Sequence, residues 1–145
     1  MARRSKIVLD SSVIVKWFTK EEGSASALKI LDSFSGGGGE APLLISVSEL
    51  SFYEVANALG HKPDFSSENV RRCVSRLLEL ELEVRKLDQA LLSESSKIAF
   101  DCQVTFYDAV PVGIAKLEKT VCVTADRKTQ YLPLLGKGYP IKLLE

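Results

Sequence analysis

The feature that most constrains this sequence is the alternation of short apolar segments with longer segments of helical periodicity. Five segments are typical of buried strands, and they lie at residues 7–9, 43–45, 82–87, 121–123 and 141–144. Between them, helical patterns run over residues 24–34, 48–59, 66–80, 88–100 and 108–118. Strands joined through helices form parallel sheets covered on both faces. The sequence therefore predicts an α/β fold of three layers, α/β/α, around a central parallel sheet of four to five strands.

Polar residues at the expected helix starts support this reading, because Ser and Asp side chains accept hydrogen bonds from the free N–H groups of a first helical turn. The capping residues expected from the sequence are, in chain order, Ser46 or Ser48, Ser66 or Ser67, Asp88 and Asp108.

Length and composition set wider limits. A chain of 145 residues corresponds to about one domain, 1–145, and its 19 basic and 19 acidic side chains leave no net charge. Any basic surface must therefore be local, and the pairs Arg3–Arg4 and Arg71–Arg72 are expected to be solvated. The glycines at 36–39 lack a following Lys-Ser or Lys-Thr, so they predict a flexible loop and not a phosphate-binding one.

The number of cysteines and the hydropathy of the sequence indicate in which cellular compartment the protein is expected. Three widely spaced cysteines and the single His61 form no zinc-finger pattern, and an odd number does not favour a disulfide framework. Cys122, within a strand-like segment, is expected to be a small buried hydrophobe. No apolar stretch reaches the roughly 20 residues of a membrane span. We expect a cytoplasmic protein.

Three acidic residues are predicted to meet at one edge of the sheet. Asp10 directly follows the first strand, and Asp126 follows the fourth, two residues after Thr124. Asp108 opens the helix that precedes the fourth strand, and the 18-residue step to Asp126 fits one helix down and one strand back. This edge, at the carboxyl ends of the strands, is where open α/β sheets bind ligands.

A fourth acid, Glu54, lies inside a helix that leaves the same edge. If Ser48 caps that helix, Glu54 starts roughly 9 Å along the axis. Helical side chains lean toward the amino end, so its carboxylate is expected to reach back to the edge. Asn57 is three residues further on and is expected to share this face, where it would hydrogen-bond Glu54 or a metal-bound water.

Four clustered carboxylates repel one another, and a hard divalent cation relieves that repulsion. Such a site suits phosphodiester hydrolysis, and the sequence contains no nucleophile elbow and no Cys beside a His. Each acid also has a plain structural alternative. Asp10 and Asp108 serve as helix caps in that view, Asp126 as a turn residue and Glu54 as a solvated helix residue.

Four segments together resemble the PIN-domain family, including the VapC-type toxin ribonucleases. They are residues 7–18, which open with the first strand and Asp10; residues 53–59 around Glu54; residues 106–109 around Asp108, followed by 114–115; and residues 123–128 around Asp126. The order and spacing cover nearly the whole chain.

The resemblance implies a PIN-like fold and an endoribonuclease dependent on Mg²⁺ or Mn²⁺. It implies that Asp10 and Asp108 bind the metal directly, that Glu54 and Asp126 act through water, and that Ser12 and Thr124 line the site. It also implies a homodimer and, for the toxin component of a type II toxin–antitoxin pair, a small antitoxin that covers the cleft.

One residue departs from the family pattern. Pro111 stands where the third motif commonly carries an aromatic residue. We expect it within the first helical turn, where proline breaks no hydrogen bond, so the fold is expected to survive. The departure bears on how substrate or inhibitor fits near that helix.

Other functions remain open. A PIN-like nuclease in RNA processing or DNA cleavage is hardly separated from a toxin by sequence, and Arg127 fits both phosphate contact and a solvated helix start. A non-catalytic module that binds nucleic acid or protein is disfavoured by the four acids. Receiver domains carry an acidic pair after the first strand, and aspartyl phosphotransferases carry a second Asp two residues after the first, where this chain has Ser12.

Overall fold

A computed structural model describes residues 5–36 and 42–145 of the chain. The predicted Arg3–Arg4 cluster and most of the glycine loop, from residue 37 on, lie outside this description. The strands are β1 Lys6–Leu9, β2 Leu44–Ser48, β3 Glu83–Arg85, β4 Cys122–Thr124 and β5 Ile141–Leu143. The helices are α1 Ser11–Val15, α2 Ser24–Phe34, α3 Leu50–Gly60, α4 Ser67–Glu79, α5 Gln89–Cys102, α6 Phe106–Leu117, the π-helical turn η2 Arg127–Tyr131, and α7 Leu132–Gly136.

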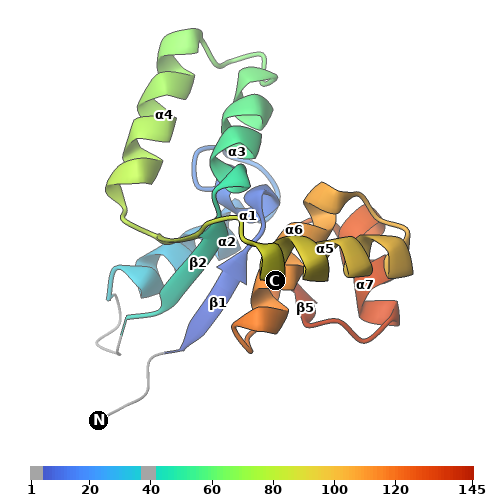
Figure 1. The fold of residues 1–145 in the computed structure, drawn as a ribbon. Coiled ribbons are helices and arrows are strands. Elements are labelled where there is room, and N and C mark those ends of the chain that lie inside the picture. Colours follow the sequence, from blue (N-terminus) through green and yellow to red (C-terminus); the bar gives the residue numbers. More distant parts are fainter. Residues whose placement is uncertain (1–4, 37–41) are drawn as a thin grey trace.

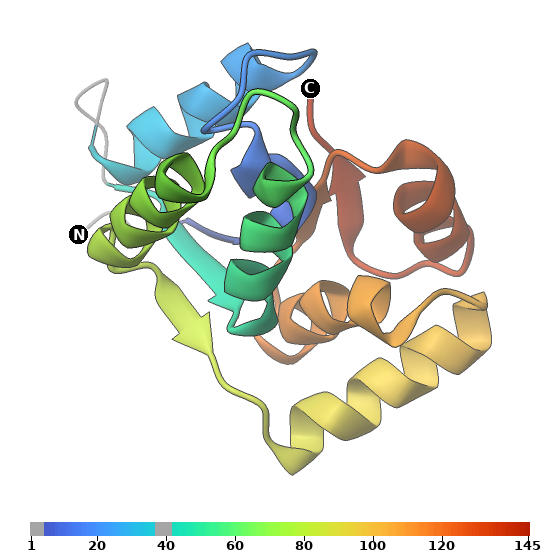
Figure 2. The same cartoon turned by 90° about the horizontal axis from the view of Figure 1, so that it is seen from above.

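The five strands form one parallel sheet in the order β3-β2-β1-β4-β5. Helices cover both of its faces, which is clear when the molecule is seen from above (Figure 2). The predicted α/β class, the three layers and the parallel sheet are therefore confirmed. Strand order reverses beside β1, because the chain builds outward to β2 and β3 before it returns to add β4 and β5 on the other side.

Successive residues of β1 supply two separate apolar cores, since alternate side chains of a strand point to opposite faces. Leu9 packs with α1, α2, α3 and α4 on one face, and Val8 packs with α5, α6 and α7 on the other. Cys122 is fully buried in the second core, as predicted. On the first face, α3 and α4 lie side by side as a helical hairpin (Figure 1).

Several predicted helix starts are confirmed at atomic detail. The Ser66 side chain accepts a hydrogen bond from Asn69 N at 3.1 Å, and Asp88 accepts one from Leu91 N at 2.8 Å. At α3 the predicted caps are wrong, because Glu49 is the cap residue and both Ser46 and Ser48 are buried residues of β2. The Ser48 hydroxyl nevertheless accepts a hydrogen bond from Leu50 N, the first residue of the helix, at 3.1 Å.

The start of α6 corrects the prediction. Thr105 is the cap, and its hydroxyl accepts a hydrogen bond from Asp108 N at 3.1 Å, so the helix begins at Phe106 and Asp108 is its third residue. Pro111 consequently stands sixth in α6, beyond the first turn. The expectation that it breaks no hydrogen bond is wrong, because a residue at this position would donate to the carbonyl of Tyr107.

The segment after β4 also differs from expectation. Tyr131 N donates to Asp126 O at 2.9 Å, and this bond across five residues defines the π-helical turn η2. Such turns are rare and are often found at functional sites. Over the described part of the chain, none of the helices is both long and apolar enough to cross a lipid bilayer.

Candidate active site

The candidate site lies where β1 and β4 end side by side. Leu9 is in register with Val123, and Asp10 N donates to Val123 O at 3.0 Å. This is the point at which the strand order reverses, and open α/β sheets bind their ligands in such a crevice. The fold therefore brings the residues that follow both strands to the predicted edge.

Asp10 is buried, with 7% of its surface exposed, and its carboxylate is held at both oxygens. Oδ2 accepts a hydrogen bond from Ser12 N at 3.0 Å, which makes Asp10 the cap of α1, and Oδ1 accepts one from Gln130 Nε2 at 3.1 Å. The cap role and the site role of Asp10 are thus compatible.

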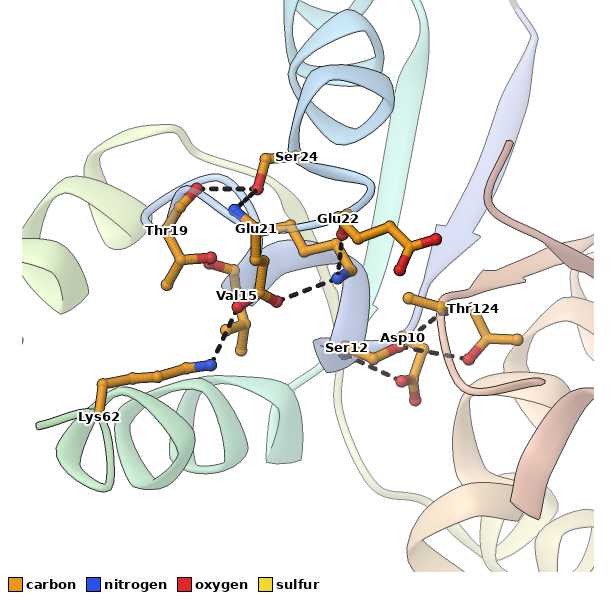
Figure 3. A network of polar contacts seen from close by, with 11 residues as sticks. Asp10, Ser12, Val15, Thr19, Glu21, Glu22, Ser24, Lys62 and Thr124 are labelled. Atoms are coloured by element: carbon orange, nitrogen blue, oxygen red, sulfur yellow. Dashed lines mark hydrogen bonds and ion pairs between the residues drawn. The ribbon is translucent and has the colours of Figure 1, made fainter. Parts of the chain in front are cut away.

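A chain of polar side chains fixes the orientation of this carboxylate. The Ser12 hydroxyl lies 3.3 Å from that of Thr124, and the Thr124 hydroxyl donates to Gln130 Oε1. Ser12 Oγ also accepts from Ala125 N at 2.9 Å. Figure 3 shows Asp10, Ser12 and Thr124 drawn together at this edge. Ser12 and Thr124 therefore connect the first and fourth strands beside Asp10, which fits their predicted place in the site.

Gln130 completes the chain and was not predicted from the sequence. Its side chain is fully buried, and its amide also donates to Asp108 O at 3.0 Å. One side chain therefore links Asp10, Thr124 and the first turn of α6. The π-helical turn places Gln130 at the interior, and no capping or periodicity signal in the sequence marks it.

Asp108 is half-buried on the first turn of α6. Burial raises the pKa of its carboxyl, and the neighbouring charge of Asp10 raises that pKa further. The hydrogen bond with Thr105 lowers the pKa, and Asp126 raises it by a smaller amount. Asp108 therefore lies within electrostatic range of Asp10 and Asp126, and its own charge acts on Glu54.

Glu54 has the largest perturbation of the four acids. Burial is the main cause that raises the pKa of Glu54 to about 7, followed by the charge of Asp10, with a smaller contribution from Asp108. A hydrogen bond with Ser11 acts in the opposite direction. Its position on the second turn of α3 agrees with the predicted reach back to the edge of the sheet.

Asp126 lies at the outer part of the edge and caps η2. Thr129 donates to it twice, from its N–H at 3.0 Å and from its hydroxyl. The charge of Asp126 raises the pKa of Asp108, after larger contributions from burial and from Asp10. Asp126 thus serves as a helix cap and lies within electrostatic range of Asp108.

The acids share one edge, but their spacing is loose. Among residues 5–36 and 42–145, no three His, Cys, Asp or Glu side chains are placed so that they could ligate one ion as they stand. The donor chemistry nevertheless fits a hard divalent cation, because all four candidates are carboxylates and two of them carry raised pKa values next to Asp10. The carboxylates would have to move closer together to hold one ion.

Two further predicted residues lie at the margin. Asn57 is exposed, and its carbonyl lies 2.7 Å from His61 Nδ1, so its proposed bond to Glu54 stays a prediction. Arg127 is exposed and lines a cavity of about 610 Å³ beside α2, α7 and β5, away from Asp10. Its contact with phosphate likewise stays a prediction.

Comparison with known proteins agrees with this architecture. The VapC20 toxin of Mycobacterium tuberculosis, described as cleaving the sarcin–ricin loop, is 12% identical, with 92% of this chain and 95% of that chain covered and a TM-score of 0.68. VapBC2 of Rickettsia felis, bound to promoter DNA, gives 13% identity, coverage of 97% and 99%, and a TM-score of 0.67. PAE2754 of Pyrobaculum aerophilum is 20% identical, with 97% of this chain and 90% of that chain covered and a TM-score of 0.63.

At these identities the solved structures establish similarity of fold. By sequence, no curated protein is significantly similar to the chain. The model of the PIN domain, however, matches residues 7–133, which include all four acids and both strands that carry the site. The chain therefore belongs to the PIN-domain family.

Proposed function

We propose that this protein is a metal-dependent endoribonuclease whose site is formed by Asp10, Glu54, Asp108 and Asp126. The observation that carries the proposal is the burial of Glu54 and Asp108 beside the charged Asp10, since burial first and the charge of Asp10 second raise the pKa of both carboxyls. In the described part of the chain, the groups that lower these two pKa values are hydroxyl-bearing residues, and no Lys or Arg is among them. Carboxylates so placed are matched to a cation.

In this proposal Asp10 and Asp108 hold Mg²⁺ or Mn²⁺ directly, and Glu54 and Asp126 act through water. When bound, the cation would activate a water and neutralise charge on the scissile phosphate. Ser12 N and Gln130 fix the Asp10 carboxylate in one orientation before any ion binds. Glu54, with a pKa of about 7, is suited to take up and release a proton near neutral pH.

Relatives support the substrate class. PIN-domain nucleases generally use divalent metal ions, and the structural relative VapC20 is described as a toxin that cleaves an RNA loop. Several similar structures are toxin–antitoxin complexes, among them one from Klebsiella pneumoniae. We therefore propose the toxin half of a type II pair, with single-stranded or looped RNA as substrate and a small antitoxin as partner.

A homodimer is part of the same proposal. Apolar side chains exposed on α5 and at the start of α6, Phe100 at 89% and Tyr107 at 58%, provide a candidate surface for self-association. Sedimentation of the wild-type protein and of Phe100→Ser tests it. A monomeric wild-type protein at micromolar concentration would contradict the dimer and leave the nuclease proposal untouched.

The decisive experiment is cleavage of end-labelled RNA by the purified protein. We expect cleavage with Mn²⁺ or Mg²⁺, none with EDTA, and loss of cleavage in Asp10→Asn, with Asp32→Asn, an exposed acid on α2, as the matched control. Cleavage that persists in EDTA would refute the metal-dependent mechanism.

The same assay separates the alternatives. Preference for single-stranded DNA would favour a DNA nuclease, and binding of RNA without cleavage by any divalent ion would favour a non-catalytic module. A gene for a small antitoxin beside this one would distinguish a toxin from an RNA-processing nuclease.

A further inference from the structure

A cavity of about 440 Å³ opens beside the carboxylate edge and has a different chemical character. It shares Ser12 and Asp126 with the candidate active site, and its other wall carries Lys16, His61 and Lys62. This volume lies in the range of small-ligand sites. The cavity therefore joins Asp126, one of the four candidate acids, to a wall that carries two lysines.

The lysines of this wall share a single carboxylate. Lys16 Nζ lies 3.0 Å from Glu21 Oε1, and Lys62 Nζ lies 3.0 Å from Glu21 Oε2. Their hydrogen bonds, that with Lys62 foremost, lower the pKa of Glu21. Figure 3 shows Glu21 reaching toward Lys62, on the same side of the molecule as Asp10 and Ser12. Lys16, Lys62 and Glu21 together carry one net positive charge, and Asp126, which lines the same cavity, carries a negative one.

This positive charge lies where an RNA substrate would need it. A group of carboxylates repels a polyanion, and basic groups beside the scissile position offset that repulsion. Lys16 follows α1, and Lys62 follows α3, so both are held by the elements that also carry Ser12 and Glu54. The basic wall is thus fixed relative to the acids by the fold.

We propose that Lys16 and Lys62 bind a backbone phosphate of the RNA strand, next to the phosphate that is cleaved, and that Glu21 occupies this phosphate position in the free protein. This inference rests on the proposed ribonuclease function and extends it to the neighbouring nucleotide. The carboxylate of Glu21 bridges both nitrogens as a phosphate would, so RNA binding exchanges one anion for another.

The proposal predicts that substitutions of the two lysines and of Glu21 change the affinity for RNA in opposite directions. Fluorescence anisotropy of a labelled single-stranded oligoribonucleotide, in the Asp10→Asn background at low salt, measures binding without cleavage. Lys62→Gln and Lys16→Gln should each weaken binding about fivefold or more, and together they should lower the slope of log Kd against log salt by about 0.7. Glu21→Gln should tighten binding severalfold, because it removes the competing charge.

Lys97→Gln, at an exposed position of α5, is the matched control for loss of one positive charge and should keep the salt slope. Lys62→Arg should retain binding, and thermal melting checks that each variant is folded. If Lys62→Gln binds RNA like Lys97→Gln, or if Glu21→Gln weakens binding, the phosphate site is refuted even when the wild-type protein cleaves RNA. If the binding effects appear and no divalent ion gives cleavage, the phosphate site stands and the ribonuclease proposal fails.

Discussion

Two regions of this molecule remove carboxylates from solvent, and they do so in opposite ways. The Glu118 side chain, 13% exposed, is paired with Lys6 at 2.7 Å near the start of β1. At the other end of β1, Asp10 lies beside Glu54 and Asp108, whose pKa values are raised. The first region has a cation built into the chain, and the second does not.

The comparison shows where buried negative charge is balanced within the protein and where it is not. Arg85 lies 3.8 Å from Glu118, and Ser46 donates a hydrogen bond to it at 3.3 Å, so this carboxylate is compensated by three side chains. Clustered carboxylates without such compensation destabilise a fold, and they persist where a ligand supplies the missing charge. The predictions below test whether the two regions are in fact opposite.

The largest expected effect is on activity in the uncompensated region. Asp108→Asn should lower RNA cleavage about a thousandfold, because it removes a direct ligand of the cation, while the melting temperature stays the same or rises. Rate measurements with Mn²⁺ and thermal melts of the same samples test both halves. A variant that loses activity only because it unfolds would remove the contrast between the regions.

In the compensated region around Glu118, a substitution should lower the stability of the protein. Glu118→Gln should lower the free energy of unfolding by about 2 kcal/mol, because it removes the buried partner of Lys6 and leaves only the exposed partner, Glu83. Glu83→Gln removes the exposed partner of the same lysine and should cost less than about 0.5 kcal/mol. Urea unfolding measures both, and equal losses would show that burial of the pair does not matter.

The next effect is on the pH dependence of stability. The pKa of Glu54 is about 7 in the folded protein and 4.5 ordinarily, so its stabilising contribution is fully present below pH 4.5 and is lost as pH rises through 7. Allowing for solvent screening, the loss is about 1 to 2 kcal/mol. Glu54→Gln should remove this slope, which unfolding curves between pH 5 and 8 would reveal.

The same titration predicts how a cation should act. Because a metal binds the ionised carboxylate, Mn²⁺ should raise the melting temperature more at pH 8 than at pH 5. An equal rise at both values would indicate that Glu54 takes no part in binding.

The smallest effect concerns Gln130, which holds Asp10 through the amide. Gln130→Met, of similar volume, should lower the affinity for Mn²⁺ about tenfold and stability by about 1 kcal/mol. Isothermal titration and unfolding curves measure the two. Unchanged metal affinity would mean that Asp10 keeps its orientation from Ser12 N alone.

Much of the architecture can be predicted from local sequence, because the spacing of apolar residues differs between helices and strands. The parallel sheet and the caps at Ser66 and Asp88 are of this kind. Thr105 could have been recognised as the cap of α6, since an acidic residue, Asp108, follows three positions later, as in a capping box.

Other features depend on tertiary contacts that no local pattern encodes. The π-helical turn that buries Gln130 forms only because β1 and α6 offer partners on both sides of the amide. Likewise, Glu21 and Lys62 are 41 positions apart and meet through the packing of α1 against α3. The sequence places the acids on one edge, while their spacing and the basic wall beside them depend on the folded chain.

Pro111 has a consequence for how firmly Asp108 is held. Because proline has no N–H, the carbonyl of Tyr107 lacks its helical donor, and the first turn of α6 is joined to the buried remainder by one bond fewer. This turn carries Asp108, so we expect the backbone of this acid to be held less firmly than the buried remainder of α6, and Pro111→Ala, which restores the missing donor, should tighten it.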